Sequence, residues 1–257
     1  KKERTMVERV GIPPRFVPFD HCSGISHAGE NVPPRVRSGA DEGSELIRVV
    51  TCSDTHSLTR QLDPALVPEG DVFVHCGDFT TKGTSEEIAE FNEWLGMLPF
   101  GRENTLVIRG NHEAGIFSRF DPRRAGELLS NATYVDASIV VVKGITFMGV
   151  PWKRQFVAQK VLREAGGGVP EGSVATVDVL FAHEPPQGIL DHGHGDETLR
   201  EMANHARVTL FGHIHESAGV EMVDSRLFVN CAVANDGMSA HTITRPIVYF
   251  DIRPSSL

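Results

Sequence analysis

Short apolar runs dominate the chain from Leu46 onward, and they predict strands. Five runs are rich in β-branched residues and apolar over most of their length: 46–53, 71–77, 105–110, 177–183 and 208–213. Strands of this kind are typically buried on both faces of a sheet. Residues 226–233 and 246–252 predict further strands, and 138–151 predicts a hairpin that turns at Lys143 and Gly144.

Helical periodicity is clearest between Thr84 and Leu98. Thr84 and Glu87 have the spacing of a capping box. Five apolar residues of this segment fall on one helix face: Ile88, Phe91, Trp94, Leu95 and Leu98. Residues 122–130 and 197–206 predict two more helices. Alternating strands and helices indicate an α/β fold, and the hairpin and the C-terminal strands indicate mixed strand directions.

Residues 1–44 have a different character from the rest of the chain. Pro, Gly, Ser, His and charged residues interrupt every short apolar stretch there, so no regular element is expected. One interpretation is a loop-like or disordered leader. We favour the other, an extended arm anchored to the body by Phe16, Val17 and Phe19. The predicted organisation is therefore a leader or arm over 1–44 and one domain over 45–257.

Composition narrows the possible partners. The chain has 257 residues and a net charge of −9, so it carries no basic excess for nucleic acid polymers or anionic membranes. No apolar run approaches the roughly 20 residues that span a bilayer, and no secretory signal is visible. The four cysteines show no CxxC spacing, and three lie in or beside apolar runs. We expect reduced core thiols and a cytoplasmic location.

Metal-ligand side chains follow the predicted strands at their carboxyl ends, where open α/β sheets place their sites. They are Asp54, His56, Asp78, Asn111, His112, His183, His213 and His215. Carboxylate, imidazole and amide groups together suit Zn, Mn or Fe and not Ca. The ligands are too many for one tetrahedral ion, so they predict two ions bridged by a carboxylate such as Asp78.

The local chain geometry around these residues also fits such a site. Asp54 and His56 are two residues apart, which would point both to one side of an extended chain. Gly77, Gly110 and Gly212 each precede ligand candidates, and glycine permits the sharp turns and close backbone approach of a crowded site.

The ordered motifs resemble those of the calcineurin-like metallophosphoesterases. They read Asp54-Thr55-His56, Gly77-Asp78, Gly110-Asn111-His112-Glu113, His183 and Gly212-His213-Ile214-His215, over roughly residues 46–252. The stretches "SDTHS", "PPQGILD" and "FGHIHE" are similar to the metallophosphoesterase-domain-containing (MPPED) subgroup. The resemblance implies a two-sheet β-sandwich flanked by helices, an αββα arrangement with mixed strands.

The resemblance also implies a role for each site residue. Asp54, His56 and His215 would hold one metal ion. Asn111, His183 and His213 would hold the other, and Asp78 would bridge them. His112 would stay off the metals and act on the phosphate as a catalytic residue. The implied cofactors are two divalent or transition-metal ions, with Mn favoured over Fe or Zn.

These features predict a dinuclear-metal phosphodiesterase that hydrolyses small phosphodiesters, with cyclic nucleotides among the candidates, by a metal-bridging hydroxide. The expected partner is a small phosphodiester or nucleotide. A phosphomonoesterase is one alternative. A nucleotide-binding or scaffold protein with little turnover is another, and it is less favoured because all eight site residues are present.

Other polar residues near the motifs are expected to have structural roles and not to bind metal. His75 is expected to be a packing histidine, and Arg109 is expected to lie within its strand. The stretch 191–197, with His192, His194 and Asp196, predicts a surface loop, with a place at the pocket rim as the alternative. Glu113 and Glu184 follow ligand candidates, so they are expected either to support them or to lie at the surface.

Overall fold

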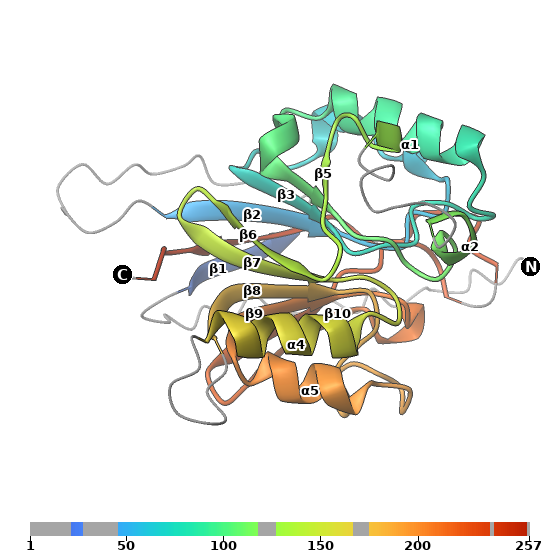
Figure 1. Cartoon of the computed structure of the whole chain (residues 1–257). Coiled ribbons are helices and arrows are strands. Elements are labelled where there is room, and N and C mark those ends of the chain that lie inside the picture. The colour runs from blue at the N-terminus through green and yellow to red at the C-terminus, as the bar shows by residue number, and fades with distance from the viewer. Residues whose placement is uncertain (1–21, 28–45, 118–126, 167–174, 237–238, 256–257) are drawn as a thin grey trace, which may run out of the picture.

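The structure, a computed structural model, describes residues 22–27, 46–117, 127–166, 175–236 and 239–255. Two six-stranded sheets lie face to face in it (Figure 1). The first sheet has the order β1 (Cys22–His27), β12 (Val248–Ile252), β2 (Ile47–Cys52), β3 (Val72–His75), β4 (Thr105–Val107) and β5 (Thr133–Tyr134). The second has the order β10 (Gly219–Val223), β11 (Arg226–Asn230), β9 (Ala206–Phe211), β8 (Val177–Ala182), β7 (Ile145–Val150) and β6 (Ser138–Val142).

Strand directions are mixed in both sheets, as predicted. Strands β2, β3, β4 and β5 run parallel, while β12 is antiparallel to β2. In the second sheet β7, β8, β9 and β11 run parallel, with β6 and β10 antiparallel at the two edges. The β6–β7 hairpin turns at Lys143 and Gly144, whose φ values of 52° and 77° suit a tight hairpin turn. The parallel strands of each sheet therefore end at one common edge.

Side chains of successive strand residues enter different apolar layers, which explains the continuous apolar runs. Val49 packs between the two sheets, whereas its neighbour Val50 packs on the outer face of the first sheet. Likewise Val179 lies between the sheets, and Leu180 packs on the outer face of the second. Both faces of the central strands are buried, as the sequence predicted.

Helices cover the two outer faces. Helix α1 (Ser85–Met97) packs on the first sheet, and α4 (Gln155–Ala165) and α5 (Glu197–Ala203) pack on the second (Figure 1). Short helices are α2 (Ala114–Phe117), η1 (Thr59–Gln61), η2 (Pro64–Leu66), η3 (Arg102–Asn104) and η4 (His215–Ser217). The predicted capping box begins α1: Thr84 accepts from the backbone of Glu87, and Glu87 accepts from the backbone of Thr84. The predicted αββα sandwich is thus confirmed.

The expectation that residues 1–44 contain no regular element is wrong in one place. Strand β1 pairs antiparallel with β12, with a register shift between Ser23 and Ile25. A strand of this kind is stabilised by the backbone of its partner, which the local sequence does not reveal. The proposed anchors Phe16, Val17 and Phe19 lie outside the described residues, as does most of the predicted helix 122–130. The boundary between leader and domain stays a prediction.

Two expectations drawn from composition concern membrane-spanning segments and cysteines. No helix of the described ranges is long and apolar enough to cross a membrane. Cys52, Cys76 and Cys231 are buried free thiols, as expected of small core residues.

Candidate metal centre

The candidate site lies where the parallel strands of both sheets end. The first sheet supplies Asp54 and His56 after β2, Asp78 after β3, and Asn111 and His112 after β4. The second sheet supplies His183 after β8, and His213 and His215 after β9. The loops of the two sheets meet, because the Ser53 amide, after β2, donates to the carbonyl of Cys231, after β11, and Ser53 also pairs with Ala232.

Several site residues have left-handed backbone conformations. The φ values are 57° for Asp54, 42° for His56, 54° for Asp78 and 68° for His213. Our expectation that Asp54 and His56 share one side of an extended chain is therefore wrong. Such residues each cost roughly 1–3 kcal/mol and persist only where their surroundings hold them. Here the amides of Asp54 and His56 donate to the carbonyls of Gly77 and Asp78, both at 3.0 Å.

Two glycines allow the ligand loops to approach one another, as predicted. A Cβ atom at Gly110 would collide with the carboxylate of Asp78. One at Gly212 would collide with the carboxylate of Asp54 and the side chain of Ser53. Any larger residue at either position would push a ligand candidate away from the site.

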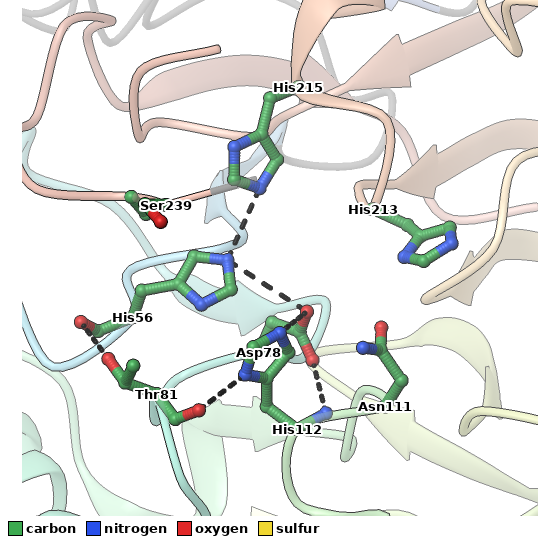
Figure 2. Close-up of a pocket in the computed structure, with 9 residues that line it drawn as sticks. His56, Asp78, Thr81, Asn111, His112, His213, His215 and Ser239 are labelled. Carbon is green, nitrogen blue, oxygen red and sulfur yellow. Dashed lines mark hydrogen bonds and ion pairs between the residues drawn. The ribbon is translucent and has the colours of Figure 1, made fainter. Parts of the chain in front are cut away.

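Asp54, His56 and His215 form one group of ligand candidates. The Nε2 atom of His215 lies 3.2 Å from Oδ1 of Asp54 and 3.2 Å from Nε2 of His56. The Nδ1 atom of His215 donates to the carbonyl of Asn235 at 2.8 Å. A carbonyl can only accept, so Nδ1 carries the hydrogen and Nε2 is the free ligand atom. Figure 2 shows this nitrogen directed at the imidazole of His56.

Asp78, Asn111, His183 and His213 form a second group. The Nδ1 atom of His183 donates to the carbonyl of Cys76 at 2.8 Å, which again directs Nε2 into the site. That Nε2 lies 2.9 Å from Oδ1 of Asn111 and 3.4 Å from Oδ2 of Asp78. The His213 ring lies 5.1 Å from the His183 ring.

Asp78 lies between the two groups. Its Oδ2 is 3.4 Å from His183 and 3.9 Å from Nε2 of His56. Its Oδ1 accepts the backbone amide of His112 at 2.9 Å. In Figure 2, His56 lies on one side of this carboxylate, and Asn111 and His213 lie on the other. The position suits a carboxylate shared by two cations.

The electrostatics of the site favour a cation. Burial by itself would raise the pKa of Asp54 and Asp78. The hydrogen bond from His215 and the positive charge of His183 lower the pKa of Asp54, and the charge and hydrogen bond of His183 lower that of Asp78. Burial would lower the pKa of His183, but the carboxylates of Asp78 and Asp54 outweigh it and raise this pKa to about 10. By contrast, burial and the charge of His183 lower the pKa of His213 to about 4. The raised pKa of a fully buried histidine marks strong negative potential.

The donor set fits metal binding. Within the described residues, three groups of ligand atoms lie within 4.8 Å of one another: Asp54, His56 and His215; Asp78, His183 and His213; and His56, Asp78 and His112. Buried carboxylates and imidazoles with the free nitrogen fixed by a backbone carbonyl are the arrangement that metal sites use. The third group includes His112, so proximity by itself does not separate this histidine from the ligands.

The hydrogen bonds of His112 do distinguish it. Its Nδ1 donates to the carbonyl of Thr81 at 2.6 Å, and its Nε2 lies 3.8 Å from Oδ2 of Asp78. Its side chain is 34% exposed, whereas those of His56 and His183 are 6% and 0% exposed. A pocket of about 260 Å³ opens over the site and is lined by His56, Asp78, Thr81, Asn111, His112, His213, His215, Ser239 and Ala240. His112 therefore presents Nε2 to a solvent-accessible pocket.

Glu113 is a buried support that sequence reasoning left without a definite role. Its Oε2 accepts the amides of Asp78 and Gly110, and its Oε1 accepts the amide and the hydroxyl of Thr80. Burial and the carboxylate of Asp78 raise its pKa to about 7, against the pull of the hydrogen bonds from Thr80 and Gly110. The carboxylate joins the loop after β3 to the loop after β4. The only sequence signal was its place directly after Asn111 and His112.

Trp152 is a second support that sequence reasoning missed. Its ring lies 4.8 Å from the His213 ring and 5.8 Å from the His183 ring. Lys153 lies over the indole face and pairs with the buried Glu184, so Glu184 supports this wall of the site. An aromatic side chain between strand and helix gave no distinctive local pattern.

The other polar residues that were expected to lie away from the site are outside the residues that line the pocket. Asp191 accepts the amides of Gly188, Gly193 and Gly195, and this folds the 191–197 stretch into a surface loop, as expected. Asp196 caps helix α5. Arg109 lies two residues past the end of β4, so the expectation that it belongs to the strand is wrong. Past the strand end, the chain passes close to the carboxylate of Asp78 at Gly110.

Comparisons with known proteins identify the family. Residues 47–217 match the model of the calcineurin-like phosphoesterase family. Metallophosphoesterase domain-containing protein 1 of Homo sapiens is 34% identical over 238 residues, which cover 78% of this chain and 70% of the relative. A UPF0046 protein of Caenorhabditis elegans is 34% identical over 252 residues, covering 86% and 81%. The fold is similar to that of the protein TT1561 of Thermus thermophilus, with a TM-score of 0.54, 16% identity and coverage of 72% and 89%. The chain belongs to the calcineurin-like phosphoesterase family, which implies a metal-dependent phosphoester hydrolase.

Proposed function

We propose that this protein is a phosphodiesterase that uses two metal ions, Mn first among them, to hydrolyse small phosphodiesters, with cyclic nucleotides among the candidates. The observation that carries the proposal is the pair of ligand groups joined at Asp78 beneath one open pocket. Asp54, His56 and His215 would hold one ion, and Asn111, His183 and His213 the other. Two ions held in this way supply a nucleophilic water at neutral pH and neutralise the charge of the phosphate.

His112 is proposed as the catalytic residue that the protein itself provides. The Thr81 carbonyl holds the hydrogen of Nδ1, so any proton that the ring gains or gives is exchanged at Nε2. Since Nε2 faces the pocket, it can donate this proton to the leaving oxygen. General acid catalysis of this kind contributes roughly 10²- to 10⁴-fold.

The pocket favours a small substrate. Its volume of about 260 Å³ lies just below the range of sites for small ligands, which span roughly 300–1,000 Å³. The net charge of −9 gives no general attraction for a polyanion. A phosphodiester of nucleotide size, attracted by bound cations, fits both facts better than a nucleic acid polymer.

An activity screen tests the proposal. Protein loaded with Mn²⁺ is offered bis-p-nitrophenyl phosphate, p-nitrophenyl phosphate, and 2′,3′- and 3′,5′-cyclic nucleotides. The diesters should be hydrolysed faster than the monoester. Replacing Asp78 with Asn should abolish turnover, and Asp224→Asn, at the exposed β10–β11 turn, should not. Preference for the monoester would establish a phosphomonoesterase, and metal binding without turnover would establish the binding or scaffold alternative.

A further inference from the structure

His75 connects two ligand loops from beneath. It is the last residue of β3, is fully buried and lies outside the set of ligand candidates. Its Nε2 lies 3.2 Å from the hydroxyl of Thr55, the residue between Asp54 and His56. Its Nδ1 accepts the amide of Gly77, the residue before Asp78, at 3.2 Å. The two nitrogens of one ring thus contact the loops after β2 and after β3.

The hydrogen bonds allow only one tautomer of the His75 ring. The Gly77 amide can only donate, so Nδ1 must be an acceptor and Nε2 must carry the hydrogen. Nε2 then donates to the Thr55 hydroxyl, which is also fully buried. Burial lowers the pKa of His75 to about 3, in agreement with a neutral ring. The groups that face it are the ligand loops on one side and apolar rings on the other.

Apolar rings pack against the other side of His75. Phe91 of α1 and Phe79 contact it edge to face, with ring centroids 4.9 and 6.0 Å away. Phe79 and Phe91 stack on each other at 4.4 Å. These rings offer no hydrogen-bonding group, so the nitrogens of His75 bond to the two ligand loops and not to this side of the ring.

We propose that His75 is a positioning residue that holds the Asp54–His56 loop and the Asp78 loop in register for metal binding. The inference rests on the proposed metal centre. It goes beyond packing because Asp54, His56 and Asp78 all have left-handed backbones, which need external restraint. His75 provides such a restraint to a residue beside each of them. It acts through Thr55 and Gly77 and touches no substrate.

Four variants separate the hydrogen bonds of His75 from its packing. Thr55→Val removes the acceptor of Nε2–H with little change of shape. Thr209→Val is its matched control, because Thr209 is equally buried but its hydroxyl has no partner among the described residues. His75→Gln shifts both hydrogen bonds. Phe91→Leu weakens the packing against His75 and leaves its hydrogen bonds in place.

The primary measurement is Mn²⁺ affinity, by isothermal titration calorimetry of chelator-treated protein, beside the Tm of the metal-free protein. Thr55→Val and His75→Gln should weaken Mn²⁺ binding by roughly 10- to 100-fold, the usual effect of losing a partner that orients ligands. Thr209→Val and Phe91→Leu should stay within about threefold of the unmodified protein, whatever their Tm.

Two results would overturn the inference. One is unchanged Mn²⁺ affinity in both Thr55→Val and His75→Gln. The other is an equal loss of affinity in Phe91→Leu, which would make packing the cause. The proposed function fails in a different way, when the unmodified protein binds Mn²⁺ but hydrolyses no phosphodiester. The affinity measurements still decide the role of His75 in that case.

Discussion

Replacing Glu113 with Gln tests whether a buried carboxylate holds the ligand loops together. Glu113 accepts four hydrogen bonds: from the amides of Asp78 at 3.1 Å, Gly110 at 2.8 Å and Thr80 at 2.8 Å, and from the Thr80 hydroxyl at 2.6 Å. All four donors point at two oxygens. A glutamine keeps the shape of the side chain but replaces one oxygen with an NH₂ group, which cannot accept.

The expected destabilisation follows from counting donors. In its better orientation, the Gln oxygen accepts from Asp78 and Gly110, and the NH₂ group faces Thr80. The Thr80 hydroxyl can rotate and accept, but the Thr80 amide loses its acceptor. One buried unpaired N–H costs about 1–3 kcal/mol. Glu113→Ala would leave three amides unpaired, or roughly 3–9 kcal/mol, which is comparable to the whole stability of a domain.

Urea unfolding of the metal-free protein at pH 5 measures the effect. This pH lies well below the raised pKa of Glu113, which is about 7, so the carboxyl group is mostly neutral in the folded protein and relief of a buried charge masks little of the lost acceptor. The free energy of unfolding should fall by about 1–3 kcal/mol with little change in the slope against urea. Glu221→Gln, on the exposed face of β10, is the control and should stay within about 0.5 kcal/mol.

A loss below about 0.5 kcal/mol in Glu113→Gln would refute the reasoning. It would mean that the amides of Asp78, Gly110 and Thr80 find other partners without penalty. A loss matched by Glu221→Gln would refute it too, since the effect would then belong to removal of negative charge from an acidic chain.

Four other outcomes are expected. His112→Ala should keep its metal by elemental analysis but lose roughly 10²-fold or more in turnover of substrates with poor leaving groups, and less with p-nitrophenyl esters. His215→Ala should lose metal and activity together, and equal metal loss in the two variants would contradict the roles assigned. Mn²⁺ loading should give about two ions per chain and, at 100 times Kd, stabilise the protein in thermal unfolding by about 2.7 kcal/mol for each ion. A content of one ion or none would contradict the dinuclear proposal. Between pH 6.5 and its folded-state pKa of about 3, His75 binds a proton in the unfolded chain but not in the folded one, so the free energy of unfolding of the metal-free protein should fall by up to about 1.4 kcal/mol for each pH unit of acidification. Urea unfolding of His75→Gln should show a weaker dependence of this free energy on pH between pH 6.5 and 4, and an equal dependence in both proteins would contradict the neutral ring. Deleting residues 1–44 removes β1, so the Tm should fall while Mn²⁺ affinity stays, and a folded deletion variant that binds no metal would place part of the site in the leader.

The elements that sequence predicted well are those whose signal is local. The central strands are apolar on both faces, and α1 carries its own capping box and a single apolar face. Helix α4 gave no such signal. Arg154 at its N-cap makes no side-chain capping bond, and two of its apolar residues, Phe156 and Val157, are exposed. Strand β1 depends on the backbone of β12, more than 200 positions away along the chain.

The candidate site shows the same division. Residues with ligand chemistry were visible because each follows a strand directly. Their supports were not, because the partners of Glu113 and His75 come from other loops and become neighbours only in the folded chain. The left-handed backbones of Asp54 and Asp78 were also hidden, since these residue types adopt several conformations and nothing local selects this one.

Each ligand group draws on both sheets, which gives the proposed metals a structural consequence. Asp54 and His56 come from the first sheet, and His215 comes from the second. Asp78 comes from the first sheet, and its partners His183 and His213 come from the second. An ion in either group would therefore join the ends of two sheets that also meet there through apolar contacts, backbone hydrogen bonds and the side-chain hydrogen bonds of Asp54 and His183. The stabilisation expected on Mn²⁺ loading should act on this seam, because unfolding either sheet alone would already break both sets of ligands.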